Sequence, residues 1–309
     1  MASTVSTRFM IISDTHGFQF GDAEKAGGHF KHPLPKCDVL LHCGDLTHVG
    51  RPSELEDCLR MLTSIHAELK LVIAGNHERP LDINWVIKHN EKKNDPNSPP
   101  FLERKRALDI LTGPLAKEAG VTYLTEGLNT FTLKNGAKFT VYSSPYTPAF
   151  CDWAFPYGRL EDRFNPADKV DYGFKCITEK PIPDFPGVDI VMTHGPPRYV
   201  LDRGWNGNVG CASLFRAISR ARPRLHCFGH IHEAYGAKLI QWSEDKESTG
   251  SSAMAHVSEG TNSYPQESRY PIIFGKETLM VNAAIMDSTY RPVNAPWLVD
   301  VDLPKATSD

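Results

Sequence analysis

No stretch of the 309-residue sequence approaches the roughly 20 consecutive apolar residues with which a helix crosses a bilayer. The first eight residues contain neither the basic stretch nor the long apolar core of a secretory signal. The seven cysteines are odd in number and form no Cys-x-x-Cys pair, a usage typical of reduced thiols. We therefore expect no membrane association and a cytoplasmic location.

An excess of either charge is also missing. Lys and Arg number 34 against 37 Asp and Glu, which gives a formal net charge of -3. This balance argues against general nucleic-acid binding. The hydrophobic content of 40% excludes a disordered chain. Since no internal repeat or low-complexity linker divides the sequence, we expect a single domain over residues 1–309.

Five short apolar runs each end in residues that can bind a metal. Near-continuous apolar runs are typical of strands covered on both faces. The run at 9–13 leads into Asp14 and His16, the run at 39–43 into Asp45, and the run at 69–73 into Asn76, His77 and Glu78. The run at 188–192 leads into His194, and the run at 225–228 into His230 and His232. One such group occurs by chance in many sequences, but five in one chain indicate a shared site.

The chemistry of these residues indicates two metal ions. Carboxylate, amide and imidazole ligands suit a divalent cation without any thiolate. Two Asp, one Asn and four His are too many ligands for one ion, but they suit two ions that share a carboxylate. Two ions roughly 3.5–4 Å apart are the usual arrangement for displacement at phosphorus. Glycines at 44, 75 and 229 would let the chain turn sharply beside them.

The remaining patterns predict helices, a hairpin and two insertions. Helices are expected at 53–65, 101–119 and 211–221, the first with a capping box at Ser53 and Glu56. Segments 130–133 and 138–143 read as a hairpin through Asn135-Gly136. Residues 91–100 are charged and Pro-rich, and 243–271 lack an apolar pattern. We expect both to be insertions, the second a flexible one.

The order of the motifs resembles that of the calcineurin-like metallophosphoesterases. Their signature D-x-H, G-D, G-N-H-E, H and G-H-x-H stands here at 14–16, 44–45, 75–78, 194 and 229–232, with no position lost. Segments 41–47, 144–148, 152–155, 193–197 and 228–236 are similar to the metallophosphoesterase-domain-containing branch, which is class III phosphodiesterase-like. The resemblance implies an α/β (α+β) fold, an αββα sandwich of two mixed β-sheets flanked by helices.

The resemblance also implies a role for each motif residue. Asp14, His16 and His232 would bind one metal; Asn76, His194 and His230 the second; Asp45 would bridge both. His77 would be the catalytic residue that protonates or stabilises the leaving oxygen without binding a metal. The cofactors would be two divalent ions, Mn, Fe or Zn, because these ligands accept each of them.

Three further residues are candidates for the surroundings of the site. Glu78 would either orient His77 or cap a helix that begins near Pro80. His48 would lie at the rim of the site or in an exposed loop. Arg159, beside the aromatic stretch 153–164, would bind phosphate or lie on the surface next to packed aromatic side chains.

The leading functional hypothesis is a metal-dependent phosphoesterase. It would hydrolyse phosphodiesters, including cyclic nucleotides, or small phosphomonoesters, by attack of a metal-bridging hydroxide on a small-molecule substrate. One alternative is a protein serine/threonine phosphatase, although residues 46–50 lack the Asp and Arg that follow Gly-Asp in that class. The others are a hydrolase of a non-phosphate small molecule and a non-catalytic scaffold on the same fold.

Overall fold

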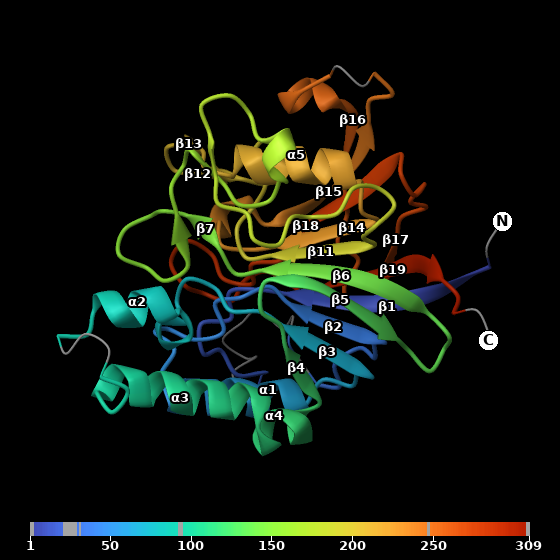
Figure 1. Ribbon diagram of the computed structural model, residues 1–309. Coiled ribbons are helices and arrows are strands. Elements are labelled where there is room, and N and C mark those ends of the chain that lie inside the picture. Colours follow the sequence, from blue (N-terminus) through green and yellow to red (C-terminus); the bar gives the residue numbers. More distant parts are fainter. Residues whose placement is uncertain (1–2, 21–29, 31, 92–94, 246–247, 307–309) are drawn as a thin grey trace.

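The computed structural model describes residues 3–20, 30, 32–91, 95–245 and 248–306. Two large mixed sheets lie face to face between helices, α5 on one side and α1, α3 and α4 on the other (Figure 1). This is the αββα sandwich that the motifs imply. No helix among the described residues is both long and apolar enough to cross a membrane.

The first sheet has six strands. Their order is β17 (Ser268–Arg269), β19 (Trp297–Pro304), β1 (Thr4–Ile12), β2 (Val39–His42), β3 (Leu69–Val72) and β4 (Val121–Tyr123). The strands from β1 to β4 run parallel, whereas β19 pairs antiparallel with β1, from Thr4 opposite Pro304 to Ile11 opposite Trp297. The parallel strands therefore end at one edge of the sheet.

The second sheet has seven strands. Their order is β16 (Met254–Glu259), β15 (Gly236–Trp242), β18 (Glu277–Asn282), β14 (Leu225–Phe228), β11 (Ile190–Thr193), β6 (Lys138–Ser144) and β5 (Gly127–Thr132). The central strands β18, β14, β11 and β6 are parallel. The hairpin of β5 and β6 confirms the Asn135-Gly136 turn predicted from the sequence.

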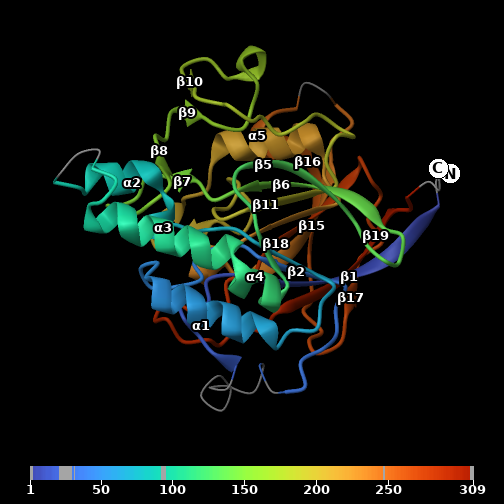
Figure 2. The same cartoon turned by 60° about the horizontal axis from the view of Figure 1, so that its bottom comes forward.

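Three apolar layers hold the sandwich together. The middle layer joins the two sheets, for example through Phe9 and Phe139, whose rings meet edge to face. The outer layers bury helices against each sheet. The helices are α1 (Pro52–Thr63), α2 (Ile83–Lys88), α3 (Pro99–Thr112), α4 (Pro114–Ala119) and α5 (Ala212–Ala221), with 3-10 turns η2 (Arg79–Leu81), η3 (Ala167–Lys169), η4 (His232–Ala234) and η5 (Gly250–Ala253). Figure 2 shows α1, α3 and α4 side by side on their face.

Loops between β6 and α5 carry six two-residue strands. They are β7 (Thr147–Pro148), β8 (Pro156–Tyr157), β9 (Glu161–Asp162), β10 (Lys175–Cys176), β12 (Arg203–Gly204) and β13 (Gly207–Asn208), which pair as β7–β8, β9–β10 and β12–β13. An ion pair anchors this region to the second sheet. Arg163 Nε and Nη2 donate to the two oxygens of the Glu126 carboxylate, just before β5, at 2.8 and 2.9 Å.

Three sequence expectations are corrected by the structure. The helix expected at 101–119 is two helices, because Gly113 and Pro114 end α3 and begin α4. Helix α1 begins at Pro52, and its capping carboxylate is Glu54, which accepts from the Arg51 N–H at 2.9 Å. In the stretch 243–271, β16 pairs with β15 and β17 with β19, so the part of it that the structure describes has regular elements that the sequence reading missed.

Candidate metal centre

The predicted ligands converge where parallel strands of both sheets end. Asp14 and His16 follow β1, Asp45 follows β2, and Asn76 follows β3; these come from the first sheet. From the second sheet, His194 follows β11, and His230 and His232 follow β14. Ligand atoms group as Asp14, His16 and His232, as His16, Asp45 and His77, and as Asp45, His194 and His230, each within 4.8 Å. Asp45 thus belongs to two groups, as a bridging residue would.

The turns that present these side chains have unfavourable backbone angles. Asp14, His16, Asp45 and His230 all have φ between 42° and 67°, a region that non-glycine residues rarely adopt. Tyr290, which lies over the same centre, has φ 59°. Strain of this kind costs about 1–3 kcal/mol per residue and persists where the surrounding structure enforces it. Such clustering is typical of functional sites.

The glycines beside the ligands act mainly through close approach. Only Gly44 has a positive φ, 97°, and a Cβ there would lie 2.6 Å from His194 Nδ1. At Gly75 a Cβ would overlap Asp45 Oδ1, and at Gly229 it would overlap Asp14 Oδ2. The chain turns at Gly75 and Gly229 as well, where the Glu78 and Ile231 N–H groups donate back to the glycine oxygens, but a backbone angle that favours glycine is found at Gly44 alone.

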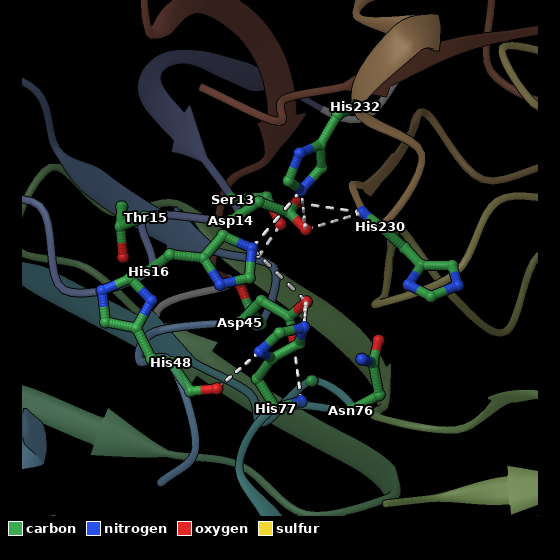
Figure 3. A network of polar contacts seen from close by, with 12 residues as sticks. Ser13, Asp14, Thr15, His16, Asp45, His48, Asn76, His77, His230 and His232 are labelled. Atoms are coloured by element: carbon green, nitrogen blue, oxygen red, sulfur yellow. Dashed lines mark hydrogen bonds and ion pairs between the residues drawn. The ribbon is translucent and has the colours of Figure 1, made fainter. Parts of the chain in front are cut away.

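Backbone carbonyls fix the orientation of three histidine rings. His16 Nδ1 lies 3.2 Å from the Thr47 oxygen, His232 Nδ1 lies 3.0 Å from the Asp287 oxygen, and His194 Nδ1 lies 2.9 Å from the Cys43 oxygen. Since a carbonyl oxygen can only accept, each Nδ1 carries a proton and donates it. In the neutral ring the lone pair is then on Nε2, which faces the centre, as Figure 3 shows for His16 and His232.

These Nε2 atoms face each other and face oxygen acceptors. His16 Nε2 and His232 Nε2 are 3.3 Å apart, and His232 Nε2 is 3.3 Å from Asp14 Oδ1. On the other side, His194 Nε2 lies 3.3 Å from Asp45 Oδ2 and 2.9 Å from Asn76 Oδ1. Lone pairs in such contact repel unless a proton or a metal ion lies between them. The donor set therefore fits divalent metal ions, one on each side of Asp45.

Burial and the carboxylates determine the charge of the rings without a cation. Burial lowers the pKa of His16 to about 4 and that of His230 to about 3, so both are neutral at pH 7 and able to coordinate. Burial also opposes protonation of His194 and His232, but Asp45 and Asp14 outweigh it and raise each pKa to about 9. In the metal-free protein, a proton on each of these two rings therefore supplies the positive charge that a bound metal ion would supply.

His77 is held differently from the other histidines. Its Nδ1 donates to the His48 carbonyl at 2.7 Å, and its backbone N–H donates to Asp45 Oδ1 at 2.9 Å. Its Nε2 is 3.9 Å from Asp45 Oδ2, and its ring lines the cleft above the ligands. The His48 side chain is exposed, so His48 contributes its backbone oxygen.

Glu78 fulfils neither of its two predicted roles directly. It is fully buried, makes no side-chain cap of η2, and has no hydrogen bond to His77. Its Oε1 accepts from the Thr47 N–H and hydroxyl, at 3.0 and 2.8 Å, and its Oε2 accepts from the Gly75 N–H at 2.6 Å. Glu78 therefore ties the Asp45 loop to the Asn76 loop.

A cleft of about 450 Å³ opens over the ligands. Its walls are aromatic: Phe150, Trp153, Trp205 and Tyr290 line it together with the cation Arg159. Tyr290 lies edge-on to His16, with ring centroids 4.9 Å apart. Sequence reasoning missed Tyr290, which follows no motif. It also missed Asn282, whose Nδ2 donates to the Ile231 oxygen at 2.9 Å and supports the His232 turn. Asn282 stands at the end of an apolar run, the signal that identified the ligands.

Comparison with known proteins identifies the family of the chain and several similar proteins. A model of the family described as calcineurin-like phosphoesterase matches residues 7–234. Metallophosphoesterase domain-containing protein 1 of Homo sapiens is 31% identical over 313 residues, covering 97% of this chain and 72% of the human protein. A UPF0046 protein of Caenorhabditis elegans is 34% identical over 244 residues, covering 74% of this chain and 52% of the nematode protein. A solved structure of a metallophosphoesterase from Sphaerobacter thermophilus gives a TM-score of 0.33 at 10% identity, over 92% of this chain and 79% of that one. The chain belongs to the calcineurin-like phosphoesterase family.

Proposed function

We propose that the protein is a hydrolase of phosphodiesters that uses two divalent metal ions, Mn, Fe or Zn. The proposal rests on two pairs of metal-binding atoms that face each other on two sides of Asp45. One pair is His16 Nε2 and His232 Nε2, and the other is His194 Nε2 and Asn76 Oδ1. Two ions bound there would supply positive charge for the phosphoryl oxygens and a nucleophile at neutral pH. Asp14, His16 and His232 would hold one ion and Asn76, His194 and His230 the other, with Asp45 shared.

His77 would act on the leaving group. Its Nδ1 donates its proton to the His48 backbone oxygen, so only Nε2 can donate a proton to the departing oxygen. The ring lines the cleft beside Asp45, where a phosphorus centre held by the metals would lie. This position suits a general acid better than a ligand, because Asn76 already occupies the ligand position of its loop.

The walls of the cleft favour a diester over a monoester. Arg159 is the one Lys or Arg among the described residues that lines it, and Glu233 adds a negative charge, so a singly charged phosphate is better matched than a dianion. The aromatic side chains suit a planar, partly apolar substituent such as a nucleobase, as in a cyclic nucleotide. We propose a small molecule of this kind as the substrate.

The test is a substrate panel on metal-reconstituted protein. Bis-p-nitrophenyl phosphate and cyclic nucleotides should be hydrolysed faster than p-nitrophenyl phosphate or a phosphopeptide. His77→Ala should lose about 10²–10⁴-fold on an ester with a poor leaving group, and less on a p-nitrophenyl ester, which needs little protonation. Faster turnover of the monoester would refute the diester assignment. Turnover of none of the phosphate esters by the loaded protein would refute the proposal as a whole.

A further inference from the structure

A tryptophan covers one face of the His77 imidazole. The rings of His77 and Trp153 are stacked, with centroids 4.0 Å apart and planes inclined by 24°. The ring of His16 meets His77 edge-on, with centroids 4.5 Å apart. With Nδ1 bonded to the His48 oxygen as well, the imidazole has little freedom to rotate. Its Nε2 remains available at the cleft.

A cation also lies over the Trp153 indole. The Arg79 guanidinium carbon lies 4.4 Å from the centre of that ring and 5.6 Å from the centre of the Trp85 ring. Arg79 makes no ion pair with any residue that the structure describes, and its Nε is buried without a hydrogen-bond partner. The two indoles are therefore its main partners, a contact worth about 0.5–2 kcal/mol for a cation on an aromatic face.

The loop that carries Trp153 is fastened on both sides of it. The Asp152 carboxylate contacts Lys88 at 2.6 Å and His89 at 2.7 Å, and its backbone oxygen accepts from the Trp85 indole at 3.3 Å. On the other side, the Ala154 N–H donates to the Asn76 backbone oxygen at 3.2 Å. Helix α2 and the ligand loop thus set the position of the indole relative to His77.

We infer that Trp153, backed by Arg79, is a positioning residue that holds the His77 ring with Nε2 toward the leaving group. The effect of this on turnover rests on the proposed function, but the arrangement itself does not. A flat ring is the shape that restricts an imidazole from its face, and Trp offers the largest such ring. Correct orientation of an acid matters because small displacements reduce its contribution steeply.

Nuclear magnetic resonance tests the arrangement independently of activity. Zinc-loaded protein with labelled histidines is compared with Trp153→Leu and Trp153→Phe, and His77→Ala identifies the His77 signals. In the wild type the indole should shift the His77 ring protons upfield. Trp153→Leu should remove that shift and increase ring motion, Trp153→Phe should keep part of it, and Arg79→Met should weaken it. Unchanged His77 signals in folded Trp153→Leu would overturn the inference.

Kinetics then tests the consequence, using two diesters that differ only in the leaving group, phenyl and p-nitrophenyl. Trp153→Leu should lower kcat about tenfold on the phenyl ester and less on the other, since it impairs but does not remove the acid. In the His77→Ala background the same change should add no leaving-group dependence. Trp205→Leu, which removes another indole of the cleft, should raise KM equally for both esters.

The outcomes are separable. An equal loss on both esters that persists in the His77→Ala background would make Trp153 only a wall of the cleft and would overturn its positioning role. Absence of turnover in the loaded wild type would count against the proposed function, and the His77 signals would still decide the arrangement. If Trp153→Leu melts well below the wild type, Trp153→Phe takes its place. We expect Trp153→Phe to show an intermediate chemical shift of the His77 ring protons and a kcat between those of Trp153→Leu and the wild type.

Discussion

The buried side chain of Glu78 offers a sharp test of how the centre is assembled, because burial and Asp45 raise its pKa to about 8 whereas its hydrogen bonds favour the carboxylate. All three groups that face it are donors: the Thr47 N–H, the Thr47 hydroxyl and the Gly75 N–H. Both carboxylate oxygens are used. Glu78→Gln keeps the shape of the side chain but replaces one oxygen by an NH2 group. Whichever way the amide turns, a donor then faces a donor in a fully buried place.

A buried donor left without a partner costs about 1–3 kcal/mol, so we expect Glu78→Gln to lower the free energy of unfolding by about 2 kcal/mol. At about 2–4 °C per kcal/mol for a chain of this size, Tm should fall by about 4–8 °C. Because Glu78 joins the Asp45 and Asn76 loops, metal affinity should fall as well. Calorimetry of metal-free and metal-loaded protein, and competition with a chelator, measure the two effects.

Glu54 is the matched control. It also accepts two backbone N–H groups, from Val49 at 3.3 Å and Arg51 at 2.9 Å, but it receives both on one oxygen. Glu54→Gln can keep that oxygen in place and should change Tm by about 1 °C at most, within the range of surface substitutions. Equal Tm values and metal affinities for Glu78→Gln and the wild type would refute the donor-only description of the Glu78 site.

Three further predictions concern the metal ions and their ligands. Elemental analysis of metal-loaded protein should give a metal content close to two ions per chain, and Asn76→Ala should reduce it to about one. A content of one ion per chain that Asn76→Ala leaves unchanged would contradict two sites. In metal-free protein, the raised pKa values of His194 and His232 contribute stability that is present below pH 6.5 and lost as the pH rises toward 9, on the order of 3 kcal/mol per histidine. Denaturation at several pH values should show this loss, and bound metal should remove it. Gly229→Ala places a methyl group against Asp14 and Ser13, so it should abolish binding at the Asp14 side. Gly207→Ala strains the backbone at its φ of 104°, but its added Cβ meets nothing within 4 Å, so it should leave metal binding intact. Normal metal content in Gly229→Ala would refute the close approach.

Much of the centre could be predicted because its ligands follow a simple rule. A run of apolar residues indicates a buried strand, and the polar residues at the end of that strand lie near those of the neighbouring parallel strands. This rule found Asp14, Asp45 and His194 without knowledge of the sheet order. It also explains the fold class, since runs buried on both faces require covering layers on each side of a sheet.

The parts that sequence reasoning missed depend on contacts without a local signal. Tyr290 reaches His16 from a loop after β18, and nothing in its own segment marks that position. Trp153 was recognised as part of an aromatic stretch, but which ring it would cover depends on the path of a loop. The roles expected for Glu78 were local, whereas its partners are Thr47, far away in the sequence, and Gly75.

The placement of β18 and β19 bears on how the protein can be made. All predicted ligands lie before Ala234, where the family match also ends, but β18 lies between β15 and β14 and β19 between β17 and β1. A chain that stops at Ala234 would leave β1 and β14 as bare sheet edges, prone to pair with other chains. During synthesis, the two sheets are therefore incomplete until β18 and β19 have left the ribosome. The emerging chain would then carry its candidate metal ligands for a period before the fold that orients them exists, and we expect stable metal capture to follow the pairing of β18 and β19.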